Sequence, residues 1–256
     1  MTKQEIEKLR KDAHTILTLP DMAQKMVKRY QTLSIQGVTV PCPYHINCGL
    51  HAKDRALVGK GRPEEIEHAA EHYLQRYQMD AHDDAERLTA YLLACGIGVD
   101  CSGFAAWVLD AVTQEQLHKP IWRCLTFPTA KRKLISAVRP LESISANLLT
   151  GKRNTHTITD LRRIRPSDML RLIHGGHVVV VSTVGLNNRG EAFYFEYVQS
   201  TTSYGGMRGI DEGVVVLTQP EGALVDQHWS DPLIYKDVVA SADDTRVVRL
   251  SCLYKN

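Results

Sequence analysis

The stretch GVDCSGFAAWVLDAV, residues 98–112, decides how this chain is interpreted. Gly98 and Asp100 are residue types that begin helices, and the apolar residues after them recur at helical spacing, at Phe104, Ala105, Val108, Leu109 and Val112. The pattern predicts a helix with Cys101 in its first turn, where unpaired N–H groups and the helix dipole favour a thiolate. The small residues Ser102 and Gly103 follow, and they leave room above the sulfur for a substrate carbonyl. Position alone allows either a reactive nucleophile or a buried structural cysteine, the usual fate of a free cysteine.

The rest of the chain divides into a helical half and a strand-rich half. Near the start, a capping-box pattern at Thr2 and Glu5 precedes one apolar stripe, which predicts a helix through Ile6, Leu9, Ala13, Ile16 and Leu17. The second half holds β-branched or aromatic runs at 169–173, 177–184, 192–199, 213–219 and 245–254, several of them separated by glycine- or asparagine-rich turns. Helices first and strands later, without alternation, predict an α+β fold with an antiparallel sheet.

A histidine and a glutamine are expected to meet across one hairpin of that sheet. His177 opens the most β-branched run, and Gln199 closes the next run after a turn at 187–190. Antiparallel pairing places the start of one strand opposite the end of the other, so the two become neighbours. Gln199 could then orient the imidazole as a base for a thiolate nucleophile. His174 is the rival base, but it would lie in the preceding turn or strand end.

Composition limits the class of protein. The chain has 256 residues, 43% hydrophobic and 23% charged, so it is an ordinary globular chain and not a disordered or fibrous one. Its first twenty residues hold no apolar block, and no stretch approaches the roughly 18 uncharged residues of a membrane span. Six cysteines are too few for a disulfide scaffold. We expect reduced thiols in the cytoplasm and no membrane partner, with non-classical export as the alternative.

A basic segment stands out against the small net charge of +2. Residues 119–165 hold eleven lysines and arginines against two acidic residues, Glu142 and Asp160. This excess indicates either a site for an anionic ligand or a solvated face with a loop. Aromatic residues are not interleaved there in the manner of nucleic-acid binders, so nucleic acid is not favoured as a partner.

Three motifs together resemble the NlpC-type papain-like cysteine peptidases: Asp100-Cys101-Ser102-Gly103-Phe104, Arg165-Pro166-Ser167-Asp168-Met169 and Gly176-His177-Val178. The similarity in order and residue type covers about residues 98–206. It implies that Cys101 is the nucleophile, His177 the base and Gln199 the polar third member of a triad. It also implies a papain-like core, in which the nucleophile helix packs on the antiparallel sheet.

The resemblance extends to the surroundings of that triad. Pro43-Tyr44 is similar to a family segment whose tyrosine borders the site, and the Tyr44 hydroxyl could join the Cys101 backbone N–H in stabilising an oxyanion. We expect Tyr44, Asp100, Ser102 and Gly176 to contact the substrate. The chain would comprise a helical N-terminal extension at 1–97, packed on the core, and a peptidase-like core at 98–256 with a basic insertion at about 118–160.

The resemblance implies a hydrolase that cleaves amide bonds in short peptides, of the kind found in peptidoglycan stems or cell-wall fragments. Two alternatives stay open: a non-catalytic binding or interaction module on a peptidase-like fold, and a thiol-dependent transferase or deamidase acting on proteins. No cofactor is expected. A zinc site at Cys42, His45, Cys48 and His51 is the rival constellation, but nearby prolines and the absence of two separated ligand pairs argue against a metal.

Overall fold

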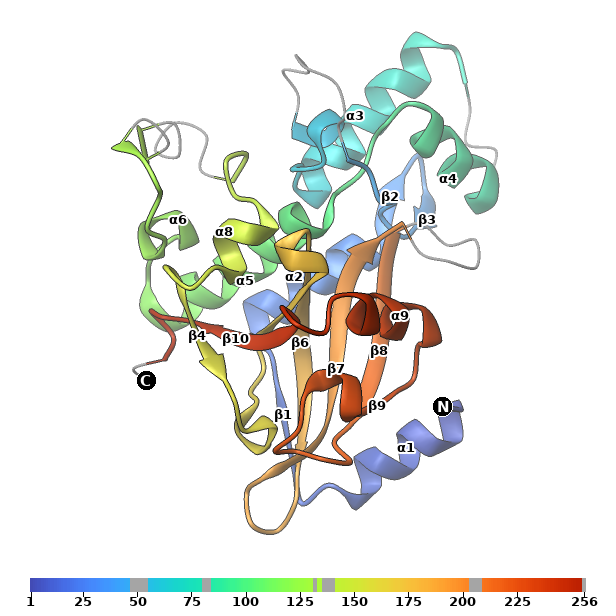
Figure 1. Cartoon of the computed structure of the whole chain (residues 1–256). Helices are drawn as coiled ribbons and strands as arrows, with labels where there is room; N and C mark the ends of the chain where they lie inside the picture. Colours follow the sequence, from blue (N-terminus) through green and yellow to red (C-terminus); the bar gives the residue numbers. More distant parts are fainter. Residues whose placement is uncertain (47–54, 80–83, 131–132, 135–140, 203–208, 255–256) are drawn as a thin grey trace.

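A computed structural model (Figure 1) describes residues 1–46, 55–79, 84–130, 133–134, 141–202 and 209–254 of the chain. Its centre is a curled antiparallel sheet with strands in the order β4-β10-β5-β6-β7-β8-β9. The strands span Thr155–Ile158 (β4), Met169–Leu172 (β5), His177–Leu186 (β6), Ala192–Thr201 (β7), Gly209–Val216 (β8), His228–Trp229 (β9) and Arg246–Leu250 (β10). The predicted α+β class with an antiparallel sheet is therefore confirmed.

Strand β6 is the central strand because it has neighbours along its whole length. Its first half, from His177 to Val180, pairs with β5 on one edge. The second half of that edge, Thr183–Leu186, pairs with β1 (Thr15–Thr18), and β7 pairs along the opposite edge. The chain's first strand thus continues the sheet where β5 has ended.

Strand β1 corrects one sequence expectation. The helix predicted through Ile16 and Leu17 ends at Asp12 as α1 (Lys3–Asp12), whose Thr2–Glu5 capping box is present, and Ala13 is extended. Helix α1 buries none of its residues, so its apolar stripe provides little packing energy. Pairing with the open edge of β6 satisfies the backbone of 15–18 instead.

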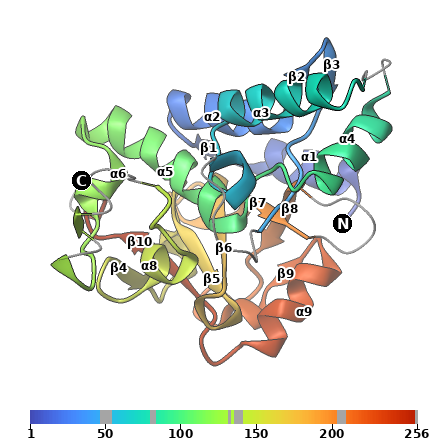
Figure 2. The same cartoon turned by 90° about the horizontal axis from the view of Figure 1, so that it is seen from above.

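The two faces of the sheet carry separate cores. Along β6, Val178 and Val180 belong to the core under the long helices, whereas Val179 and Val181 belong to the core on the other face. Figure 2 shows α2 (Asp21–Gln31), α3 (Pro63–Arg76) and α5 (Cys101–Leu117) on one side of the sheet and α9 (Pro232–Ala240) on the other. Both faces are buried, so β6 is a continuous hydrophobic run, not an alternating one.

The N-terminal region is not helical throughout. Besides β1 and its helices, which include α4 (Ala85–Ala94), it holds the small hairpin β2 (Leu33–Ile35) and β3 (Val38–Val40). Its buried side chains share one core with α5 and β6, and Tyr30 packs edge-on against Phe104 with ring centroids 5.3 Å apart. The shorter helices α6 (Ile121–Cys124) and α8 (Ala146–Thr150) flank α5. Within the described ranges, no helix is both long and apolar enough to cross a bilayer.

Helix α5 is buried along most of its length, and its first turn packs against the backbone of Gly59. A Cβ added at Gly103 would lie 2.2 Å from the carbonyl oxygen of Gly59. A carbonyl in that position cannot rotate away as a flexible side chain could. The first turn of α5 therefore requires glycine at this position, although alanine is the better helix former.

We predict that Gly103→Ala lowers the free energy of unfolding by about 2 kcal/mol, because overpacking outweighs the gain in helix propensity. The control is Gly190→Ala in the β6–β7 loop, where the new methyl group would contact nothing within 4 Å and only the positive φ of 74° opposes it. Urea denaturation of both variants measures the difference. A Gly103→Ala protein as stable as the parent would contradict the packing of α5 on Gly59.

Candidate active site

Asp100 organises the start of α5. It is the N-cap residue, and its Oδ1 accepts hydrogen bonds from the Gly103 backbone N–H at 2.6 Å and from the Ser102 hydroxyl at 2.9 Å. The preceding residue is also held, because the Ser200 hydroxyl on β7 donates to the Val99 carbonyl at 2.8 Å. Cys101, the first residue of the helix, is thereby positioned by the cap and by the sheet together.

A buried lysine that the sequence analysis did not single out completes this cap. Lys60 Nζ lies 2.9 Å from Asp100 Oδ1, 2.5 Å from Ser102 Oγ and 3.2 Å from the Ile144 carbonyl oxygen, and the residue is only 8% exposed. Three oxygen acceptors satisfy the three ammonium donors, as a buried charge requires. A lone lysine forty positions before Asp100 carries no sequence signal for this role.

The Cys101 thiol lies against the first residues of β6. Its Sγ is 3.9 Å from the Gly176 carbonyl oxygen and accepts a hydrogen bond from the Val178 backbone N–H, so it contacts the chain on both sides of His177. Burial, and then the charge of Asp100, raise the pKa of Cys101 to about 11, although Val178 and Lys60 act in the opposite direction. The helix N-terminus alone favours a thiolate, but desolvation outweighs it.

His177 and Gln199 meet as the hairpin geometry predicts. His177 Nε2 is 2.7 Å from Gln199 Oε1, and both side chains are buried, at 9% and 2% exposure. An amide oxygen can only accept, so Nε2 carries the proton and Nδ1 keeps its lone pair in the neutral ring. Among the described residues, Nδ1 has no hydrogen-bond partner, and no hydrogen bond joins the imidazole to the Cys101 thiol.

Asp211 on β8 fixes which way the Gln199 amide faces. Gln199 Nε2 donates to Asp211 Oδ2 at 3.3 Å, and a carboxylate accepts only from the NH₂ end, so the amide oxygen is directed at His177. Burial raises the pKa of Asp211, and the bond to Gln199 opposes that rise. Sequence reasoning missed this residue, because its role depends on the β7–β8 register that pairs Gln199 with Asp211.

The other expected site residues divide into two groups. Gly176 contacts the thiol, and Tyr44 forms a backbone bridge with Val99, while its half-buried ring packs on the core under α5. Asp100 and Ser102 are instead engaged by Lys60 and the helix cap. The rival base His174 lies outside the cluster, because its side chain is 60% exposed and its Nδ1 is 4.0 Å from Asp243.

The alternative zinc cluster is only partly described. Cys48 and His51 lie outside the described residues. The Cys42 thiol is fully buried, donates to the Pro43 carbonyl at 3.6 Å, and has a pKa raised by burial. His45 Nε2 is 3.2 Å from the Leu57 carbonyl oxygen. Each of these two side chains therefore already has a partner in the protein.

Comparison with models of protein families, with curated proteins and with solved structures finds no match to this chain. What this site can do is therefore inferred from its own residues. Those residues form a thiol at a helix N-terminus and an oriented neutral imidazole on a residue whose two chain neighbours contact the sulfur, and both groups are buried. Burial lowers the pKa of His177 and raises that of Cys101, so the resting pair is neutral and a proton must move during any attack.

We predict that iodoacetamide at pH 7 alkylates Cys124 before Cys101. A hydrogen bond from Cys252 lowers the pKa of the half-buried Cys124 thiol to about 7, whereas Cys101 is buried with a pKa of about 11. Only the thiolate reacts, so Cys124 has far more of the reactive form. Peptide mass spectrometry over a time course measures the order. In Cys252→Ala, which lacks the hydrogen-bond donor, Cys124 should react more slowly. Modification of Cys101 before Cys124 in the parent protein would contradict the lowered pKa of Cys124 and the raised pKa of Cys101.

Proposed function

We propose that this protein is a cysteine hydrolase of amide bonds, with a papain-like arrangement of Cys101, His177 and Gln199. The observation that carries the proposal is the buried 2.7 Å contact between His177 Nε2 and Gln199 Oε1. It leaves Nδ1 as the basic nitrogen, on a residue whose two chain neighbours both contact the Cys101 sulfur. A thiol, a base and a group that orients the base are the parts of covalent acyl-transfer catalysis.

The mechanism follows from the neutral resting pair. Cys101 Sγ attacks the amide carbonyl as His177 Nδ1 takes the thiol proton, and the imidazolium then gives that proton to the leaving amine. A water molecule, deprotonated by the same nitrogen, then attacks the thioester carbonyl, the C–S bond breaks to release the acid, and the imidazolium returns the proton to Cys101 Sγ. The backbone N–H of Cys101, in the first turn of α5, has no partner within the helix and can donate to the developing oxyanion.

The substrate class comes from the sequence resemblance and not from a bound molecule. Short peptides of the peptidoglycan-stem type are the substrates that the resemblance favours. The reacting side chains are 6% and 9% exposed, so an attacked carbonyl must reach a nearly closed site. A short, extended peptide suits such an approach better than a folded protein surface.

A non-catalytic binding module is the second candidate, and the burial of the same residues favours it. A thiol with a pKa of about 11 that forms no hydrogen bond to the imidazole, among the described residues, is also what a structural cysteine would show. The two candidates differ in whether Cys101 forms a covalent adduct with an electrophilic peptide, since only the hydrolase needs a nucleophilic sulfur.

We predict that Cys101→Ala and His177→Ala each lower hydrolysis of stem-type peptides by roughly 10⁴-fold or more, and that the double variant loses no more, because the pair acts as one unit. Gln199→Ala should lose roughly tenfold, the value of one hydrogen bond that orients the ring. Gln199→His should keep substantial activity.

Matched controls are Cys124→Ala and His174→Ala, which remove a thiol and an imidazole outside the cluster and should leave hydrolysis unchanged. Steady-state kinetics on a panel of stem and unrelated peptides, with circular dichroism to verify folding, provides the measurement. Cleavage that persists in Cys101→Ala would refute the mechanism. A folded parent protein that forms no adduct with electrophilic peptides would instead establish the binding module.

The pH profile gives a further prediction. His177 must be neutral to accept the thiol proton, and burial lowers its pKa below the ordinary value of 6.5. The acid limb of kcat/KM should therefore have its midpoint below pH 6.5. Gln199 opposes that lowering, so Gln199→Ala should move the midpoint to still lower pH. A midpoint above pH 6.5, or an upward shift in Gln199→Ala, would contradict the role of His177.

A further inference from the structure

A polar cavity lies at the opposite end of α5 from Cys101. It is open to solvent on one side, has a volume of about 400 Å³ and is lined by Gln116, Arg165, Pro166, Ser167, Arg249 and Leu253. Gln116 is fifteen residues along the helix from Cys101, which corresponds to about 22 Å at 1.5 Å per residue. The cavity is therefore separate from the candidate active site.

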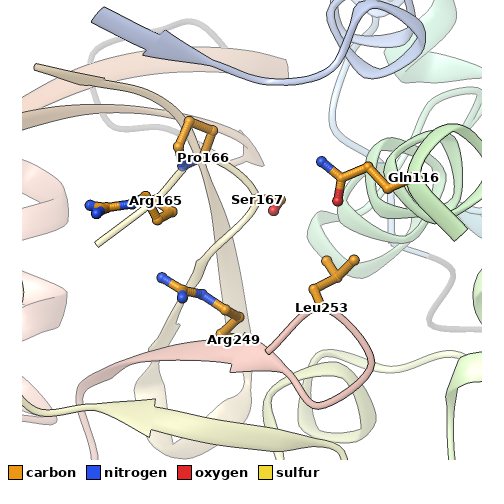
Figure 3. Close-up of a pocket in the computed structure, with 6 residues that line it drawn as sticks. All are labelled: Gln116, Arg165, Pro166, Ser167, Arg249 and Leu253. Atoms are coloured by element: carbon orange, nitrogen blue, oxygen red, sulfur yellow. The ribbon is translucent and has the colours of Figure 1, made fainter. Parts of the chain in front are cut away.

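The cavity is lined by hydrogen-bond donors and carries positive charge. Figure 3 shows the Arg249 guanidinium on one side, the Gln116 amide on the opposite side and the Ser167 hydroxyl between them, while the Arg165 guanidinium extends outward, away from Ser167 and Gln116. Arg249 holds the fully buried Asp168 through two contacts, at 2.6 and 2.8 Å, but its Nη1 has no partner among the described residues. Within the same residues, the Arg165 guanidinium uses only one of its donors, Nη1, which donates to the Ile164 carbonyl at 2.9 Å.

The charges around the cavity leave an excess of one positive charge. The cavity has two guanidinium groups, those of Arg165 and Arg249, and one nearby carboxylate, that of Asp168. Both Asp168 oxygens are already occupied, by the Arg249 guanidinium and by the Arg165 backbone N–H. The carboxyl end of α5 adds a partial negative charge nearby. The excess therefore depends on Arg165, since Arg249 alone is balanced by Asp168.

Ser167 is held in a conformation that its side chain does not favour. Its φ is +72°, in the left-handed region where glycine is the usual residue. Its backbone N–H donates to the Val181 carbonyl at 2.9 Å, so the sheet imposes this conformation on the turn. The residue is only 7% exposed, and its hydroxyl has no partner among the described residues. A strained residue that directs an unpaired polar atom into a cavity indicates a role beyond folding.

We propose that this cavity is a binding site for an oxyanion, namely a phosphate or carboxylate group. Arg249 Nη1, the Ser167 hydroxyl and the Gln116 amide are the donors assigned to the anion, and the Arg165 guanidinium contributes its positive charge from the edge of the cavity. Fork-shaped guanidinium groups match the geometry of both anions. A volume of about 400 Å³ exceeds that of the anionic group alone, so the group is one end of a larger small molecule.

The test is a titration of the ¹⁵N-labelled full chain with inorganic phosphate or with acetate, at constant ionic strength maintained by chloride. Saturable shifts of the Ser167 backbone amide and the Gln116 side-chain amide are expected, and the tighter of the two probes identifies the class of anion. The Cys101 amide, about 22 Å away, should not shift. No saturable shift with either probe would overturn the proposal.

Two arginine variants distinguish specific binding of the anion in the cavity from nonspecific electrostatic attraction to a basic surface. Arg165→Gln should weaken binding about threefold or more, because it removes the one excess positive charge at the cavity. The control is Arg163→Gln, which removes the same charge two residues away from a side chain that is 81% exposed and does not line the cavity. Equal weakening by both variants would assign the binding to diffuse charge and overturn the proposal.

Substitution of Ser167 tests the strained hydroxyl. Ser167→Gly should raise the melting temperature of the free protein, because glycine tolerates the positive φ, and should also weaken binding about tenfold. Ser167→Ala keeps the strain and removes the hydroxyl, so it should weaken binding without the rise in melting temperature. Undiminished binding in both variants would contradict the assignment of Ser167 to the anion.

Discussion

The buried contact between Lys60 and the Asp100 carboxylate joins parts of the chain that are distant in sequence. Asp100 caps α5, Lys60 neutralises Asp100, and the same ammonium group holds Ser102 and the Ile144 carbonyl. Neither charge could be buried alone, because desolvation of an unpaired ion costs several kcal/mol. The pair therefore brings the segments around residues 60, 100 and 144 together, and the position of Cys101 follows from it.

The sheet supplies the other half of the candidate site through β6. Because β6 has neighbours along its length and a core on each face, its first residue is held firmly at the rim. His177 is thus oriented by β7 and, through Gln199, by Asp211 on β8. Positioning by three adjacent strands limits the rotation of an imidazole more than a loop could.

The burial that positions the Cys101 thiol and the His177 imidazole also opposes their ionisation. It raises the pKa of the Cys101 thiol and lowers that of the His177 imidazole, so both are neutral at rest. A thiolate–imidazolium pair would be activated before substrate arrives, whereas in the mechanism that we propose the proton moves with the attack. The same water exclusion strengthens any hydrogen bond to a developing oxyanion.

Sequence alone determined the elements that depend on neighbouring residues. The first turn of α5 and the meeting of His177 with Gln199 follow from local periodicity and hairpin geometry, as do the strands at 169–172, 177–186 and 192–201. The runs predicted at 213–219 and 245–254 match β8 and β10 only in part, and no strand was predicted at β4. The strand at 15–18 could not be predicted, since Ile16 and Leu17 fit a helical stripe and only the open edge of β6 decides otherwise. Lys60 and Asp211 acquire their roles from contacts across 40 residues and across a strand register. The protonation state of Cys101 likewise required the tertiary structure, because desolvation depends on what covers the thiol and not on the residues beside it in the chain.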